Sequence, residues 1–270
     1  MNTKCGFNVS HSIPKLMQAS LAAALILLVV NGAIADIPPS PALRETMKTG
    51  EQLIQRQLMT QFTNVETTMK ELLGAYNARH PEDLWIETLS VKQLQRLVLT
   101  RSNDLAPRLL LLAREPEDDT DSQEWLANLK ASYTLATNEP VRVTCLVLAM
   151  GGTFALEGKP FGKAMLRDLE QWLQKLKAQQ PEPAVAEKIK YLQLFGALGT
   201  ESYADVPVYA QGTPFRTLAP LWLMSKGKWE LALKEVRQLK ALPDLSRDEG
   251  STLDTFESVL KGMTEKKPVN

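Results

Sequence analysis

The chain has 270 residues, of which 44% are hydrophobic, with 31 basic and 31 acidic side chains. This length and apolar content suffice for one large packed domain or a short helical array. No block of lysine and arginine supplies the concentrated positive charge that nucleic-acid binding requires, so we expect no nucleic-acid partner.

Residues 1–35 have the pattern of a secretory signal peptide. Two lysines precede an apolar run at 21–30, and Ala35 ends a short stretch of small residues before Asp36. We therefore expect cleavage between Ala35 and Asp36 and a periplasmic or secreted protein. The alternative is an uncleaved segment that anchors the protein by a single pass, although a span needs about 20 apolar residues.

Cleavage leaves Cys145 as the one cysteine and His80 as the one histidine. An intramolecular disulfide and a zinc site built from several such ligands are then excluded, and we expect no resident metal or cofactor. His80 precedes Pro81 and is expected to be a solvated residue at a helix C-terminus. Cys145 lies in an apolar run and is expected to be buried, with an intermolecular disulfide as the alternative.

The predicted elements start after a proline-rich spacer at 36–42. A long helix is predicted at 43–79, because apolar residues recur there at spacings of three and four, as on one helix face. Alternation typical of a strand occurs only at 206–209. We expect a single all-helical domain at 43–263 and a polar tail at 264–270.

Helical hairpins are predicted at 84–262 from a weak internal repeat. The pattern Trp-Leu-x-x-Leu-Lys-Ala occurs at 125–131 and again at 172–178, with a looser copy at 228–234. A proline at the start of the following helix and glycines near its end complete each unit. A period in the forties predicts an all-α stack of helical hairpins, a solenoid of the HEAT or tetratricopeptide kind. Chance similarity would leave an irregular helical bundle.

Local signals predict several helix ends. Ser90 can cap a helix that starts at the next residue, and Asp121 with Glu124 fits a capping box. Gly152 and Gly199 are expected just past the ends of their helices.

Two motifs resemble enzyme or metal sites but depart from the required pattern. Ser225 and Lys228 have the Ser-x-x-Lys spacing, yet Gly227 interrupts the helix that would stack them, and we expect a turn. The acidic stretch at 119–123 resembles the start of a calcium loop, but glutamate occupies the position that needs glycine. We expect a solvated acidic turn there.

Paired carboxylates are the one catalytic option that needs neither histidine nor cysteine. Glu201, followed by Ser202, has the composition seen in helical enzymes that cut cell-wall glycan, with Asp205 as the second acid. A carboxylate-dependent glycan hydrolase is therefore an alternative function.

The stretch 199–214 carries two prolines and lacks helical periodicity, so an irregular loop is predicted. Its aromatic residues argue against disorder. Tyr203, Tyr209 and Phe215 are candidate anchors for a protein partner. The alternative is a connector that packs these rings back onto the helices.

These features together predict an exported, non-catalytic helical protein that acts as an interaction or scaffold component. Its partner would be another envelope or periplasmic protein, in an assembly such as a secretion, conjugation or pilus system. Contact with the membrane is expected only through the signal segment, if that segment is retained.

Overall fold

The computed structural model describes residues 41–83, 86–114, 118–156, 159 and 162–265. The signal segment, its cleavage site between Ala35 and Asp36, and most of the spacer and polar tail lie outside these residues. Within the described part all regular elements are helices, which confirms the all-α prediction. No helix there is long and apolar enough to cross a membrane.

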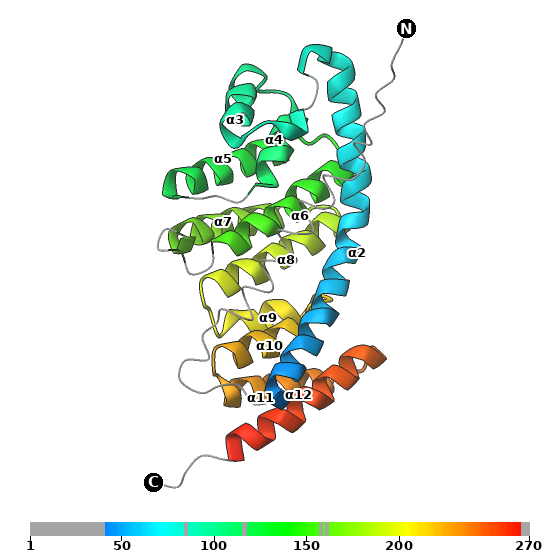
Figure 1. Cartoon of the computed structure of the whole chain (residues 1–270), viewed down its shortest axis with the longest axis vertical. Coiled ribbons are helices and arrows are strands. Elements are labelled where there is room, and N and C mark those ends of the chain that lie inside the picture. Colours follow the sequence, from blue (N-terminus) through cyan, green and yellow to red (C-terminus); the bar gives the residue numbers. More distant parts are fainter. Residues whose placement is uncertain (1–40, 84–85, 115–117, 157–158, 160–161, 266–270) are drawn as a thin grey trace.

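The helices follow one another with short connections. In chain order they are α2 (Pro41–Arg79), the 3-10 turns η2 (Pro81–Asp83) and η3 (Ile86–Thr88), α3 (Val91–Thr100), α4 (Leu105–Leu112), α5 (Asp119–Leu135), α6 (Glu139–Ala155), α7 (Gly162–Ala178), α8 (Pro183–Gly199), α9 (Asp205–Gln211), α10 (Leu218–Ser225), α11 (Trp229–Lys240) and α12 (Arg247–Glu265). Figure 1 shows α3 to α12 stacked along the long axis, with α2 running beside them.

Helix α2 occupies the range in which the sequence predicts a long helix. Its 39 residues span about 58 Å, at about 1.5 Å per residue. Ile54, Leu58, Val65, Met69 and Tyr76 on its apolar stripe are buried. The helix packs against α4, α6, α10 and α12, so it contacts both ends of the stack (Figure 1).

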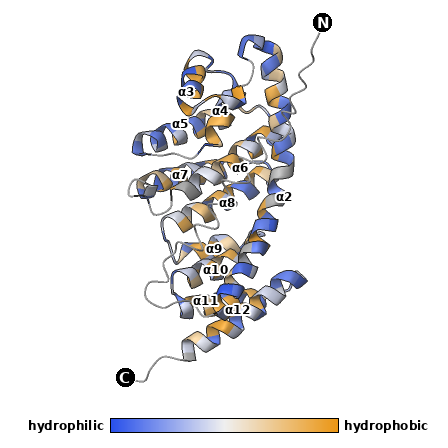
Figure 2. Ribbon diagram, in the orientation of Figure 1, coloured by the Kyte–Doolittle hydropathy of each residue, from blue (hydrophilic) through white to orange (hydrophobic). Residues whose placement is uncertain are grey.

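Burial differs between alternate helices of the stack. Every residue of α10 and most residues of α8 are buried, whereas α7 and α11 bury one stripe and expose the opposite face. A helix that is apolar on all sides needs cover on all sides. Figure 2 accordingly shows more hydrophobic residues along α6, α8 and α10 than along α5 and α7.

The predicted helix ends at the two glycines have different outcomes. Helix α8 ends within one residue of the predicted position, but Gly199 is its last helical residue and Thr200 is the C-cap. Helix α6 instead continues through Gly152 to Ala155. A Cβ atom at Gly152 would lie 2.3 Å from Cζ2 of Trp125, so glycine here permits the close approach of α5 to α6 and does not cap a helix.

Of the two predicted N-caps, one is confirmed and one is wrong. Ser90 caps α3 in a capping box whose second partner is the Gln93 side chain. The predicted capping box of Asp121 with Glu124 is wrong. Helix α5 begins at Asp119, and Asp118 accepts the capping hydrogen bond from the Asp121 N–H. In a run of acidic residues several side chains can cap a helix, and the sequence does not select among them.

The prediction of an irregular loop at 199–214 is wrong for residues 205–211. Helix α9 occupies Asp205–Gln211, including the 206–209 segment that alternates like a strand. Pro207 lies in the first turn of this helix, where a backbone N–H has no intrahelical acceptor and its loss costs little.

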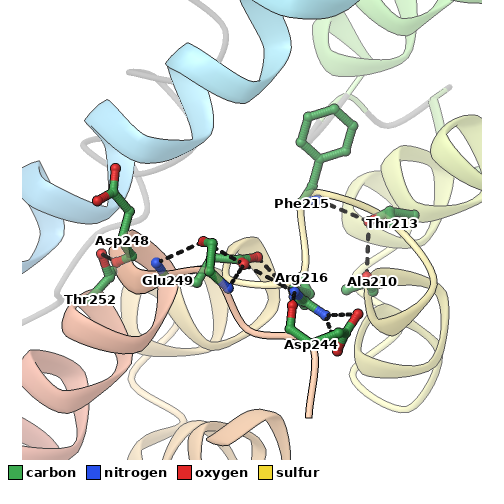
Figure 3. A network of polar contacts seen from close by, with 9 residues as sticks. Ala210, Thr213, Phe215, Arg216, Asp244, Asp248, Glu249 and Thr252 are labelled. Carbon is green, nitrogen blue, oxygen red and sulfur yellow. Dashed lines mark hydrogen bonds and ion pairs between the residues drawn. The ribbon is translucent and has the colours of Figure 1, made fainter. Parts of the chain in front are cut away.

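A buried ion-pair network joins the connection before α10 to the connection before α12 (Figure 3). Arg216 bonds the Glu249 carboxylate at 2.8 and 3.0 Å and the Asp244 carboxylate at 3.0 and 3.1 Å. The side chains of Arg216 and Glu249 are only 10% and 6% exposed. Ser246 completes a capping box for α12 with Glu249.

We expect the Gly152→Ala substitution to destabilise the protein by about 1–3 kcal/mol, because the new methyl group overlaps the Trp125 ring. Gly196→Ala is the matched control. Its Cβ meets no heavy atom within 4 Å, so we expect it to stabilise α8 by about 0.5–1 kcal/mol. Urea unfolding of both variants measures the difference. Equal effects would contradict the close contact between α5 and α6.

Glu249 makes stability depend on pH. Burial raises its pKa, but hydrogen bonds from Arg216 and Ser246 outweigh this and lower the pKa from the ordinary 4.5. A depressed pKa in the folded state stabilises the fold above about pH 4.5, and this contribution is lost as the pH falls through the lower folded value. Glu249→Gln should therefore cost about 1–3 kcal/mol at pH 7 and flatten the acid side of the melting-temperature profile.

The exposed neighbour Asp248 provides the control for this measurement. Asp248 forms one surface ion pair with Arg56, and such pairs contribute little. Asp248→Asn should change the free energy of unfolding at pH 7 by less than about 1 kcal/mol. If Glu249→Gln keeps the wild-type slope below pH 4.5, the network does not carry the acid sensitivity.

Candidate partner-binding groove

The three predicted partner anchors do not form one exposed patch. Phe215 is 0% exposed, and its ring centroid lies 4.9 Å from that of Tyr191 and 5.9 Å from that of Phe195, both in α8. In Figure 3 its side chain points away from the Arg216 network. Phe215 is therefore a core residue in this structure and is not accessible to a partner.

Tyr203 and Tyr209 are half-buried and pack against different helices. The Tyr203 ring lies 5.1 Å from the ring of Trp222, with Nζ of Lys228 5.2 Å from its centroid. The Tyr209 hydroxyl donates to Glu170 in α7 at 3.2 Å. Burial, together with this carboxylate, raises the pKa of Tyr209 to about 12. Both rings pack back onto the stack, as the connector alternative predicts.

The candidate catalytic residues are occupied by structural contacts. Glu201 pairs with Lys226 at 3.1 Å, and its φ of 56° places it in a tight turn after α8. Ser225 is buried and donates to the Trp222 carbonyl, while Lys228 lies over Tyr203. Ser225 and Lys228 therefore have separate partners.

His80 is less exposed than the sequence predicts. Its side chain is 24% exposed, its Nε2 lies 3.1 Å from Asp104, and its ring packs on Tyr76. Ligand atoms of His80, Glu82 and Asp83 lie within 4.8 Å of one another, which is compatible with a metal ion. The Arg101 guanidinium, however, contacts both carboxylates at 2.8 Å.

This cluster already contains its cation. Arg101 follows the last residue of α3, while Glu82 and Asp83 belong to η2, so the ion pairs tie α3 to the end of α2. Their effect is to fix the position of α3.

Cys145 lies in α6 and is fully buried, as the sequence predicts. Burial raises the pKa of its thiol to about 12, so the thiolate that would react or form a disulfide is disfavoured.

A groove of about 790 Å³ lies between α3 and α5, with α4 and the residues that follow it as the floor. Leu99, on the α3 side, is 81% exposed. Val91 and Val98 lie on the same side, while the small residues Ala127 and Ala131 form part of the α5 side. Leu99 and the valines make this side of the groove apolar, and a contiguous exposed apolar patch, unlike a single exposed residue, can mark an interaction surface.

Helix α3 has one apolar stripe and one exposed leucine outside it. Leu94 is buried and Leu97 packs against the main core. Val91 and Val98, three residues before and four residues after Leu94, belong to the same face of the helix and also line the groove. Leu99 lies outside this stripe and is mostly in solvent, so it contributes little to packing this domain.

Four cations line the groove. Lys92 and Arg96 belong to α3. Arg108 belongs to α4, and Arg114 lies two residues after the end of α4. Within the described part of the chain none of these four forms an ion pair with a carboxylate. The acids of the lining are Asp121 and Glu124 on α5.

Arg108 is held in place by neutral groups. It donates to the Ser102 carbonyl at 2.9 and 3.0 Å and to the Asn128 side chain at 3.1 Å. Partial burial lowers its pKa, and none of these contacts supplies a neutralising charge. The groove therefore has an oriented but uncompensated cation in its floor.

The sequence interpretation missed this groove, although one signal was available. The run Leu97-Val98-Leu99 in a ten-residue helix contains more apolar residues than one stripe requires. Which of these side chains faces solvent depends on how α3 packs against α4.

Comparison of the chain with models of protein families, with curated proteins and with solved structures finds no match. The functional interpretation therefore rests on the geometry of this chain.

We expect Leu99→Ala to change the free energy of unfolding by less than about 0.5 kcal/mol, because the side chain is mostly in solvent. Leu94→Ala on the same helix should cost about 2–5 kcal/mol, because Leu94 is fully buried. Chemical denaturation of both variants tests this. A large loss of folding free energy in Leu99→Ala would show that Leu99 stabilises the fold and is not available for contact with a partner.

Proposed function

We propose that this protein is a non-catalytic helical scaffold that binds another protein through the groove between α3 and α5. The single observation that carries the proposal is the apolar lining of the groove by Val91 and Val98, with Leu99 exposed beside it. The candidate catalytic side chains support it, because Glu201 and Ser225 are bound to structural neighbours.

The stacked arrangement suits such a role. We interpret α5 to α8 as two helix–turn–helix units of a solenoid, each containing one copy of the tryptophan repeat. Arrays of this kind present long surfaces built from many helices and commonly bind proteins. Helix α2 covers one side of the array, which leaves the exposed faces of α3, α5, α7 and α11 for contacts.

The pattern of residues 1–35 supports a location outside the cytoplasm for this binding. We propose a periplasmic or secreted accessory component of an envelope assembly, such as a secretion, conjugation or pilus system. This part of the proposal rests on the signal pattern alone.

Lysine-reactive cross-linking in intact cells that produce the protein tests the proposal. We expect one partner to be recovered in stoichiometric amount, and the purified mature chain to begin at Asp36. Repeated recovery of the free monomer would contradict the binding role, and retention of residues 1–35 would contradict release from the membrane. Cleavage of cell-wall glycan by the purified protein, lost in the Glu201→Gln variant, would contradict the scaffold proposal and support the hydrolase alternative.

A further inference from the structure

We propose that the groove binds an amphipathic α-helix of the partner protein, with its apolar side on Leu99 and Val98 and carboxylates on its flank. The inference rests on the proposed function and specifies the chemistry of the partner. It follows from the shape, the apolar lining and the charge of the groove.

The shape of the groove matches a helix. Helix α3 packs against α4, and the hydrogen bond from Gln95 to Glu124, at 2.8 Å, joins it to α5. Gln95 and Glu124 both belong to the lining, so this bridge crosses the groove. On the Leu99 side of the bridge, residues 96–100 of α3 span about 8 Å. A bound helix can place about one and a half turns against this wall, as in the helix-in-groove mode of recognition.

The apolar lining is asymmetric in a way that favours helix packing. Leu99 and Val98 are larger side chains on the α3 side. Ala127 and Ala131, one turn apart on α5, are small and leave room on the α5 side for side chains of a bound helix. Large side chains of a bound helix at positions i, i+3 and i+7 can lie over the alanines and against Leu99. Leu99, which gains the most burial, is the expected hot spot.

The charge of the lining selects an acidic helix. Lys92 and Arg96 are exposed on α3 and have no carboxylate partner among the described residues. Arg108, held by neutral groups, adds a third cation. Asp121 and Glu124 lie on the opposite wall. Carboxylates on the partner flank that faces α3 would pair with Arg96 and Lys92, whereas a basic helix would leave these cations unpaired.

The chain's own termini fit the groove poorly. Residue 265 ends α12, which packs beside α11 at the end of the stack opposite α3 (Figure 1). The N-terminal segment has no acidic residue before Asp36, so it offers no carboxylate to the α3 cations.

Site-specific photo-cross-linking in cells that produce the protein tests the inference. A benzophenone amino acid is placed at position 99, and at position 231 as the control, since Leu231 is an exposed leucine on α11. We expect position 99 to attach to one partner segment, and mass spectrometry to show apolar residues at helical spacing with at least two flanking acids. A lipid, a second copy of this chain or a basic segment attached at position 99 would overturn the inference.

A synthetic peptide with the captured sequence then measures affinity for the purified mature chain. Leu99→Asp and Arg96→Glu should each weaken binding about tenfold or more, whereas Leu231→Asp should leave it unchanged. Binding should also weaken as salt rises, and more steeply for wild type than for Arg96→Glu. Unchanged binding by Leu99→Asp would overturn the inference.

Different results would contradict the proposed function and the inference about the groove. Lysine-reactive cross-linking could recover a partner that attaches at position 231 and not at position 99. That result would keep the proposed scaffold function but contradict binding in the groove. Absence of any partner in both experiments would remove the proposed function itself.

Discussion

The whole stack depends on apolar contact along α2. Helices α8 and α10 are apolar around most of their circumference, so neighbours on one side alone would leave them partly in water. Helices α6, α7 and α9 cover α8, while α9, α11 and α2 cover α10. Because α2 reaches from α4 to α12, it also joins helices that are far apart in the sequence and would otherwise meet only their nearest neighbours.

Polar residues in this fold mostly serve as joints between helices. Arg216 fixes the connection before α12 through Glu249, and Arg101 fixes α3 through Glu82 and Asp83. Buried or half-buried ions need partners, and breaking one partner leaves an uncompensated charge. Residue types that suggest catalysis in isolation are therefore engaged here in holding neighbouring helices together.

The groove is a consequence of how the stack ends. Helix α3 packs on α4 and lies at one end of the described stack, so its outer side meets no further helix there (Figure 1). In the proposed complex a partner would bury Leu99 on this side, and the cations beside it would restrict which partner fits. The described fold thus leaves Leu99 in solvent at the end of the stack.

Much of the fold could be predicted from the sequence because helical periodicity is local. The stripe of α2, the capping serine at 90 and the burial of Cys145 follow from spacing and composition. The site could not be predicted in this way, because Leu94 and Leu99 are chemically identical and lie on one helix. The sequence by itself determined an all-helical chain with few reactive side chains. Only the tertiary structure decided that Leu94 and Phe215 lie in the core and that Leu99 faces solvent, because exposure depends on which helices pack against each face.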